Sequence, residues 1–433
     1  MTTRSVRDCR SCGGHLDTIL DLGVLAVSNF PDGELDVLAS PRAPLDLCAC
    51  TTCRLVQLRH TVDPDTLFRD HYWYRSGINE TMRAELADVV AQGIAHVDRF
   101  AFSDFVCDIG ANDGTLLAEY RRHLVTRDVP RIAFEPARNL QSALAQHAEV
   151  HIADYFPPTR IEHRGLTGRV RILTSIAMFY DLDDPSRFVE GVRELLHPQG
   201  VWIVQFQDLH QMMRATAFDN ICHEHLCYYS LQSFEQLIAP HGLTVVDAEV
   251  RAINGGSYRL YVKHTPAERC VTQANVSKLR QWEADCQDWH ALERFGWRVG
   301  EVKKQIRAVL DHLTDLGPID VYGASTKFNT LAQYCGLDGA LIRQAWERSP
   351  EKVGRQTVTG IPIVSEEAGR ADPPTALLAG IWQFRESILQ REAEYVAQGG
   401  AILFPLPAVD LVTTAKLIRW LARIERRTEK PTW

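Results

Sequence analysis

Four cysteines near the start of the chain stand in two pairs with the spacing of a zinc site. Cys9 and Cys12 form one Cys-x2-Cys pair, and Cys50 and Cys53 form the other. Two such turns bring four thiolates to the corners of a tetrahedron, the geometry that Zn²⁺ prefers. Because four sulfur ligands leave no open coordination position, we expect a structural ion that helps a small domain to fold. Cys48 is a rival ligand, and the alternative is four reduced thiols without a metal.

A glycine-containing loop with the sequence Asp-Ile-Gly-Ala-Asn-Asp-Gly occupies residues 108–114, directly after a buried apolar run at 105–109. Glycines at such a place let a ligand approach the backbone at a helix N-terminus. Glu135 ends the next expected strand, where a carboxylate accepts hydrogen bonds from ribose hydroxyls. The tight Gly-x-Gly-x-x-Gly loop of nicotinamide-binding proteins is absent. A structural turn and a site for another nucleotide are the alternatives.

The loop resembles the S-adenosylmethionine loop of class I methyltransferases, which has the pattern Asp-x-Gly-x-x-x-Gly. In that fold the adenine lies after the third strand, where this chain has Asp154-Tyr155-Phe156. The resemblance therefore implies S-adenosylmethionine as cofactor. The expected contacts are Asp108, Gly110, Asn112, Asp113, Gly114, Glu135, Asp154, Tyr155 and Phe156.

Two further clusters carry groups suited to acid–base chemistry. His223-Glu224-His225 comes after an apolar run at 201–204, and ligands bind outside the carboxyl ends of such strands. An imidazole there acts as a general base near neutral pH, and a neighbouring carboxylate orients it. The alternatives are a second metal site or a surface polar cluster. Tyr72-Trp73-Tyr74 is an aromatic cluster that is otherwise typical of a core or of a contact before a helix.

The segment Gly323-Ala324-Ser325-Thr326-Lys327 follows an apolar run at 319–322. Small residues, hydroxyls and a lysine at a helix start can hold a pyrophosphate, although a simple helix cap is the alternative. Arg343, Arg348 and Lys352 could neutralise a diphosphate, unless they are solvated surface charges.

The elements that must position these residues alternate between short apolar runs and helical stretches. The runs at 105–109, 131–134, 170–176 and 201–204 predict a parallel α/β sheet, and a second alternation begins at 319. We expect a zinc-binding domain at 1–70, a Rossmann-like methyltransferase domain at 71–265, a helical connector at 266–316, and a second Rossmann-like α/β domain at 317–433.

Composition excludes several classes of protein. With 47 Lys and Arg against 55 Asp and Glu, the net charge is −8, which argues against a nucleic-acid binder. The 45% of apolar residues argues against disorder, and no run is long enough for a transmembrane helix. The start of the chain is polar, unlike a signal peptide, so we expect a cytoplasmic protein. The other six cysteines are expected to be buried and unligated.

Together these residues resemble the sugar-nucleotide C-methyltransferases, such as the 3-C-methyltransferases of antibiotic deoxysugar pathways. The resemblance extends from Cys9 to Pro407. Besides the two cysteine pairs and the loop at 108–114, it rests on Tyr74-x-Ser76-Gly77, Thr81-Met82, Glu135-Pro136-Ala137, His223-Glu224-His225-Leu226, Gly255-Gly256-Ser257, the segment 323–327 and Pro350-Glu351-Lys352.

This resemblance implies methylation at C3 of a TDP-activated 4-keto-6-deoxyhexose. It implies that His225 is the base, Glu224 its partner and Tyr74 an active-site phenol, and we group His223 with them. The expected acceptor contacts are Tyr72, Asn254, Ser325, Lys327, Asn329, Arg348 and Lys352. The chain departs from the family at Cys222, at Asn254 and over residues 175–180.

Other functions remain open at this point. An O- or N-methyltransferase, or a C-methyltransferase for a metabolite that is not a sugar, would need the same cofactor. A zinc-ribbon binding protein without catalysis is a second alternative. We expect a small-molecule acceptor, no nucleic-acid or membrane partner, and a monomer or weak homodimer.

Overall fold

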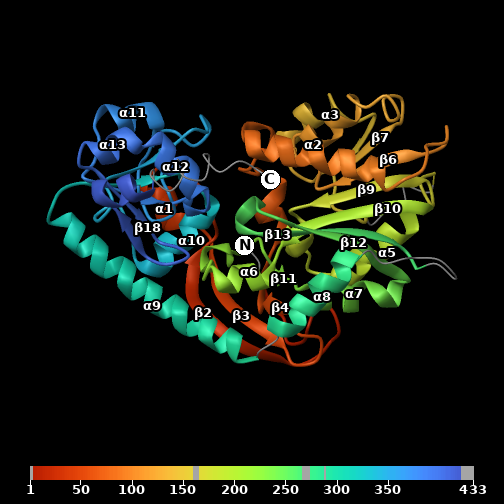
Figure 1. Cartoon of the computed structure of the whole chain (residues 1–433), viewed down its shortest axis with the longest axis horizontal. Helices are drawn as coiled ribbons and strands as arrows, with labels where there is room; N and C mark the ends of the chain where they lie inside the picture. The colour runs from red at the N-terminus through yellow and green to blue at the C-terminus, as the bar shows by residue number, and fades with distance from the viewer. Residues whose placement is uncertain (1–2, 159–164, 266–273, 287–288, 421–433) are drawn as a thin grey trace. The chain divides into compact units, whose positions relative to one another are not determined.

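The computed structural model describes residues 3–158, 165–265, 274–286 and 289–420 (Figure 1). The chain forms two compact units. The first contains residues 1–19, 46–211 and 223–288, and the second contains residues 20–45, 212–222 and 289–433. The predicted zinc-binding segment therefore contributes to both units, and the predicted connector at 266–316 is divided between them.

A seven-stranded sheet forms the centre of the first unit, in the order β12-β13-β10-β9-β6-β7-β8. The strands β6 to β10 pair in parallel, and β13 pairs antiparallel with both β10 and β12. Their bounds are β6 Phe105–Ile109, β7 Arg131–Phe134, β8 Val150–Ile152, β9 Val170–Ile176, β10 Leu196–Gln207, β12 Leu243–Arg251 and β13 Ser257–His264. The four predicted strands are confirmed, and the strand order reverses between β6 and β9, where ligands bind in such sheets.

Both faces of this sheet are covered by helices, as Figure 1 shows for α2 and α3 on one face and α5 and α7 on the other. The alternation along β10 explains why. Val201 and Ile203 pack toward Val89 of α2, whereas Trp202 packs against Phe234 of α7. Successive side chains of a strand point to opposite faces, so a wholly apolar strand is buried between two layers.

The helices of the first unit are α2 Glu80–Ala95, α3 Thr115–Tyr120, α4 Gln141–Leu144, α5 Pro185–Leu195, α6 Leu209–Arg214, α7 Leu231–Ile238 and α8 Ala274–Cys286. Side-chain oxygens cap three of them. Asn79 accepts hydrogen bonds at the start of α2, Asp184 at α5, and Ser230 at α7. Each cap satisfies backbone N–H groups that have no partner within the helix.

The amino-terminal segment consists of short strands. β1 Thr3–Ser5 pairs with β5 His60–Val62, and a second sheet has the order β11-β4-β3-β2. Its strands are β2 Leu16–Ala26, β3 Arg42–Cys50, β4 Val56–Leu58 and β11 Cys227–Tyr228, with α1 Glu34–Ala39 between β2 and β3. Cys227 pairs with Gln57, so the chain that follows His223-Glu224-His225 is held by the zinc-binding segment.

The second unit contains a six-stranded sheet in the order β16-β15-β14-β17-β18-β19, parallel except for β19. Its strands are β14 Ile319–Tyr322, β15 Gln344–Glu347, β16 Ile363–Ser365, β17 Ala376–Ala379, β18 Ala401–Phe404 and β19 Asp410–Val412. Its helices are α9 Trp289–Thr314, α10 Thr326–Cys335, α11 Glu366–Ala371, α12 Arg385–Arg391 and α13 Ala393–Ala397. The predicted second α/β sheet is confirmed. Among the described residues, no helix has the length and apolar character needed to cross a membrane.

Candidate functional site

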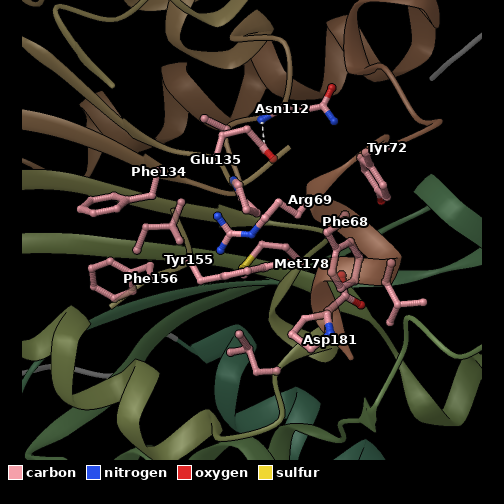
Figure 2. Close-up of a pocket in the computed structure, with 18 of the residues that line it drawn as sticks. Phe68, Arg69, Tyr72, Asn112, Phe134, Glu135, Tyr155, Phe156, Met178 and Asp181 are labelled. Atoms are coloured by element: carbon pink, nitrogen blue, oxygen red, sulfur yellow. Dashed lines mark hydrogen bonds between the residues drawn. The ribbon is translucent and has the colours of Figure 1, made fainter. Parts of the chain in front are cut away.

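A cavity of about 690 Å³ lies in the first unit, at the carboxyl ends of β6, β7 and β9 (Figure 2). Its walls include Gly110 after β6, Glu135 after β7, and Met178 after β9. The volume is within the range of about 300 to 1,000 Å³ that is typical of small-molecule sites. The cavity therefore occupies the place in the sheet where the sequence predicts the cofactor.

The loop at 108–114 needs glycine for a steric reason. Gly110 has φ +72°, and a Cβ atom there would lie 2.8 Å from Cγ of Met178. Gly114 has φ +81°, and its Cβ would lie 3.0 Å from the side chain of His147. L-residues rarely adopt such angles, so both glycines let the chain turn sharply between β6 and α3.

Glu135 holds this loop from the neighbouring strand. Its carboxylate accepts hydrogen bonds from the backbone N–H of Asn112 at 2.8 Å and of Ala137 at 2.8 Å (Figure 2). Burial raises the pKa of Glu135, and these backbone donors oppose that shift. Each carboxylate oxygen keeps a further lone pair. Glu135 can thus accept from ribose hydroxyls while it shapes the loop.

Two residues of the loop position the segment that carries Tyr74. The Asn112 side chain accepts from the N–H of Ser76 at 2.9 Å and donates to the carbonyl of Tyr74 at 3.1 Å. Asp113 accepts from the N–H of Gly77 at 2.9 Å. Of the predicted cofactor contacts, Asp113 and Gly114 do not line the cavity, whereas the other seven do.

Asp108 is the buried acid at the base of the cavity. Its Oδ1 accepts a hydrogen bond from Thr174 Oγ1 at 2.6 Å. Burial raises the pKa of Asp108 to about 7, the Thr174 hydroxyl opposes this, and the charge of Glu135 adds to it. A cationic ligand favours the ionised carboxylate, so this site suits a ligand with positive charge.

Asp154, Tyr155 and Phe156, three of the residues expected to contact the cofactor, also line the cavity. Asp154 accepts from Arg69 Nη2 at 3.0 Å, and the Arg69 guanidinium lies 4.7 Å from the centre of the Tyr155 ring. Phe156 packs against Phe134, with ring centres 4.9 Å apart. Sequence reasoning missed Arg69 and its neighbours, because nothing local connects residues 61–69 with this cavity.

Tyr72, Tyr74 and Asp181 also line the cavity, and the sequence singled out the two tyrosines. Burial, with the nearby charge of Glu224, holds the pKa of Asp181 well above its ordinary value. Burial and the charges of Asp181 and Glu224 also raise the pKa of Tyr72. Because the charge of Glu224 acts on both Asp181 and Tyr72, Glu224 lies within electrostatic range of these two groups.

His223-Glu224-His225 itself does not line the cavity, but its neighbour Leu226 does. The His225 ring meets the ring of Tyr180 edge-on, with centres 4.5 Å apart, and Tyr180 precedes Asp181. His223 is 3% exposed. The roles assigned to these three residues stay predictions.

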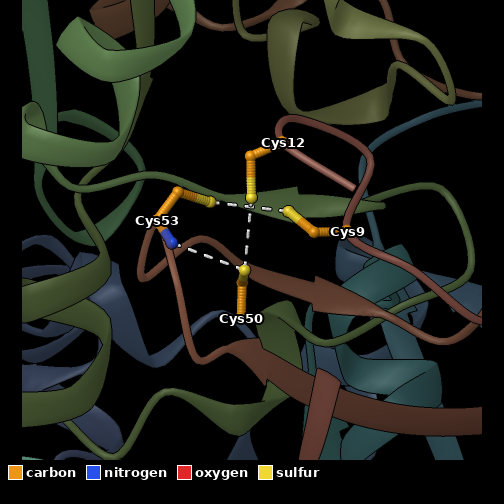
Figure 3. Close-up of side chains that lie close together, drawn as sticks. All are labelled: Cys9, Cys12, Cys50 and Cys53. Atoms are coloured by element: carbon orange, nitrogen blue, oxygen red, sulfur yellow. Dashed lines mark hydrogen bonds between the residues drawn. The ribbon is translucent and has the colours of Figure 1, made fainter. Parts of the chain in front are cut away.

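The four predicted zinc ligands come together (Figure 3), all four sulfur atoms lying within 4.8 Å of one another. Sγ of Cys9 and Cys53 are 3.5 Å apart, as are Sγ of Cys12 and Cys50. Four sulfurs bound at about 2.3 Å from one ion lie about 3.8 Å apart, so the cluster fits Zn²⁺. Cys48 lies outside the cluster, and burial raises the pKa of its thiol to about 11.

The three residues that were expected to neutralise a diphosphate have protein partners. Arg348 pairs with Glu366 at 2.7 Å, and Lys352 donates to the Ala324 carbonyl at 3.0 Å. Arg343 pairs with Asp320 at 2.8 Å. These contacts compensate the charges that we expected to neutralise a diphosphate.

Of the three predicted acceptor contacts at α10, two have protein partners and one has none among the described residues. Ser325 caps the helix by accepting from the N–H of Phe328 at 3.0 Å, the simpler of the two interpretations of this segment. Asn329 is buried and donates to Ser28 Oγ at 3.0 Å. Lys327 makes no hydrogen bond or ion pair within the described residues, and burial lowers its pKa while the charge of Asp219 opposes this. Asn254 lies in the first unit, in the turn between β12 and β13.

Family models match three successive parts of the chain. Residues 9–68 match a domain described as "Putative zinc binding domain", residues 78–248 a "Methyltransferase domain", and residues 252–407 a "C-methyltransferase C-terminal domain". C-methyltransferase NovU of Streptomyces niveus is 29% identical over 415 residues, which cover 93% of this chain and 96% of the relative.

The solved structures that this chain is similar to cover less of it. The CcbJ methyltransferase from Streptomyces caelestis is 13% identical and covers 45% of this chain and 94% of its own, with a TM-score of 0.33. An S-adenosylmethionine-dependent methyltransferase from Clostridium acetobutylicum is 10% identical and covers 42% and 92%, also with a TM-score of 0.33.

Proposed function

We propose that this chain, which belongs to the S-adenosylmethionine-dependent C-methyltransferases with a zinc-binding, a methyltransferase and a C-terminal domain, methylates a carbon next to a ketone. The acceptor that we propose is a nucleotide-activated 4-keto-6-deoxyhexose, methylated at C3. The observation that carries the proposal is the cavity, which is lined both by residues of the loop at 108–114 and by the two phenols Tyr72 and Tyr74.

The cavity supports the cofactor through its charges. S-adenosylmethionine, when bound, supplies a methyl group on a positively charged sulfur. Asp108, Glu135 and Asp154 give the cavity carboxylates along its length. Glu135 would accept from the ribose and Asp154 from the adenine amino group, and Asp108 would balance the positive charge.

Carbon attacks such a methyl group only when it carries negative charge, so a base must first remove the proton next to the ketone. We assign this step to an imidazole nitrogen of His225. As the C–H electrons move onto the ketone oxygen, the Tyr74 hydroxyl donates a hydrogen bond to that oxygen, as an oxyanion hole does. His225 would keep the proton while the electron pair returns from the oxygen to form the new carbon–carbon bond. The electrons of the broken methyl–sulfur bond would stay on sulfur, which leaves as the uncharged thioether of S-adenosylhomocysteine.

The proposed nucleotide contact is Lys327 in the second unit. Arg343, Arg348 and Lys352 are engaged with protein partners, whereas the Lys327 ammonium has no direct partner among the described residues. A half-buried ammonium without a direct partner favours an anionic or polar ligand atom beside it. A phosphate of the acceptor fits this requirement.

The test uses isotopically labelled S-adenosylmethionine with a panel of TDP-4-keto-6-deoxyhexoses, and the product is analysed by mass spectrometry and NMR. We expect one methyl group at C3 and, without cofactor, exchange of the C3 proton for deuterium in heavy water. His225→Asn should lose both activities, whereas the exposed His312→Asn should keep them. A methyl group on oxygen or nitrogen, or turnover by His225→Asn, would refute the proposal.

A further inference from the structure

The zinc-binding segment forms one wall of the cofactor cavity. Thr61, Leu67, Phe68 and Arg69 line the cavity together with residues of the methyltransferase sheet. Figure 2 shows both Phe68 and Arg69 among the lining residues, with Arg69 beside Tyr155 and Phe68 beside Tyr72. The short helical turn η1, Asp65–Arg69, thus brings side chains from outside the methyltransferase domain to the cofactor.

Arg69 is fixed at the adenine end of the cavity by three contacts. Its Nε donates to Asp65 Oδ1 at 2.6 Å, its Nη2 donates to Asp154 Oδ1 at 3.0 Å, and its guanidinium lies over the Tyr155 ring. Asp154 is the carboxylate placed to receive the adenine amino group. Arg69 therefore holds Asp154 in position and offers a flat surface on which a ring can stack.

A chain of contacts connects this wall with the first zinc-binding turn. Arg10 lies between Cys9 and Cys12, and its side chain is 2% exposed. It donates to Thr61 Oγ1 at 2.8 Å and approaches Asp183 Oδ1 at 3.4 Å. Thr61 also donates to Asp183 at 2.8 Å, and Thr61 and Asp183 both line the cavity.

The second zinc-binding turn lies close to the same wall in sequence. Cys53 is followed directly by β4 and β5, and Thr61 belongs to β5. The backbone N–H of Arg10 donates to the side chain of Gln57 in β4 at 2.9 Å. The first turn is thus connected to the cavity wall by side-chain hydrogen bonds, and the second by the short stretch of chain that leads from Cys53 to Thr61.

We propose that residues 61–69 are part of the cofactor site, with Arg69 as a cofactor-positioning residue, and that zinc binding and cofactor binding are coupled through Arg10. Without the ion, nothing binds the two cysteine turns to each other, so residues 61–69 are held less firmly. Cofactor binding would then have to fix these residues in place, which weakens the affinity. Such coupling is reciprocal, so the cofactor should also slow the loss of zinc. This inference does not depend on the identity of the acceptor.

The first experiment measures the binding of S-adenosylhomocysteine by calorimetry to the zinc-loaded, full-length protein. We expect Arg69→Met and Arg10→Met each to weaken binding about tenfold, which equals about 1.4 kcal/mol. Arg7→Met is the matched control, because Arg7 is an exposed arginine of the same segment. Binding by Arg69→Met that is unchanged or tighter would overturn the assignment of Arg69.

The second experiment follows zinc transfer to a chromophoric chelator, which uses the folded, loaded protein. Saturating S-adenosylhomocysteine should slow the transfer severalfold in the unmodified chain and much less in Arg10→Met. Transfer at the same rate with and without the ligand would overturn the coupling. This readout holds even where removal of zinc unfolds the protein, and it does not require an acceptor.

Discussion

The pH dependence of cofactor binding follows from one carboxyl group. Burial raises the pKa of Asp108 to about 7, so the carboxyl is protonated below this pH and ionised above it. S-adenosylmethionine carries a positively charged sulfonium, whereas S-adenosylhomocysteine has an uncharged thioether. The ionised carboxylate of Asp108 should therefore favour the methyl donor over the product. Raising the pH from 6 to 8 should therefore tighten binding of S-adenosylmethionine relative to S-adenosylhomocysteine.

The size of the effect follows from the titration. With a pKa of about 7, roughly 9% of Asp108 is ionised at pH 6 and roughly 91% at pH 8, about a tenfold change. If the donor binds only the ionised form, the ratio of the two dissociation constants should change by up to about tenfold. This corresponds to about 1.4 kcal/mol.

Calorimetry of both ligands at a series of pH values provides the measurement, and Asp108→Asn is the decisive variant. Asparagine can still accept the hydrogen bond from Thr174 but does not titrate, so the pH dependence of the ratio should vanish. The same variant should be more stable at pH 8 than the unmodified chain. The folded pKa of Asp108, about 7, lies above the value of about 3.9 in an unfolded chain. The folded protein therefore loses stability as the pH rises from about 4 to about 7, and this loss is complete at pH 8. A ratio that changes equally in Asp108→Asn would refute this reasoning.

Three further predictions concern the framework of the site. Arg259→Met should destabilise the fold by about 3 kcal/mol in urea unfolding, because Arg259 is fully buried and its loss leaves the carboxylate of Glu85 with a single partner on β12. Gly110→Ala should weaken S-adenosylhomocysteine binding at least tenfold in calorimetry, since the new methyl group would collide with the cavity wall at a positive φ; unchanged affinity would show that the loop adapts. Cys12→Ser should lose the bound zinc in a metal assay while Cys48→Ser keeps it, because Cys48 lies outside the sulfur cluster.

Much of the fold could be predicted because buried strands have a recognisable pattern of apolar residues in the sequence. β6 and β9 are enclosed between helical layers, so most of their residues are apolar and they stand out from the polar turns around them. The loop at 108–114 follows from its glycines, which the positive φ angles require. The paired cysteines identify their own cluster, since a Cys-x2-Cys turn brings its two sulfurs to one side.

The ion-pair partners of charged residues could not be predicted from such a local pattern. Arg343 pairs with Asp320, which precedes it by 23 residues, and Arg348 pairs with Glu366, which follows it by 18. A local pattern of positive charge is the same whether a ligand or a neighbouring strand supplies the negative charge. The contact of Arg69 with Asp154 crosses 85 residues, and it became visible only once the fold brought the two segments together.

The positions of Asn112 and Asp113 give the cofactor loop a second task. Their side chains hold the backbone of residues 74–77, so the segment that carries Tyr74 is bonded to the loop that we propose receives the methyl donor. Transfer of a methyl group requires the reacting carbon and the methyl to lie about 3 to 3.5 Å apart in line. A phenol anchored to the donor loop keeps its distance to the methyl group even when other parts of the chain move. The same few hydrogen bonds thereby position the two sides of the proposed reaction relative to each other.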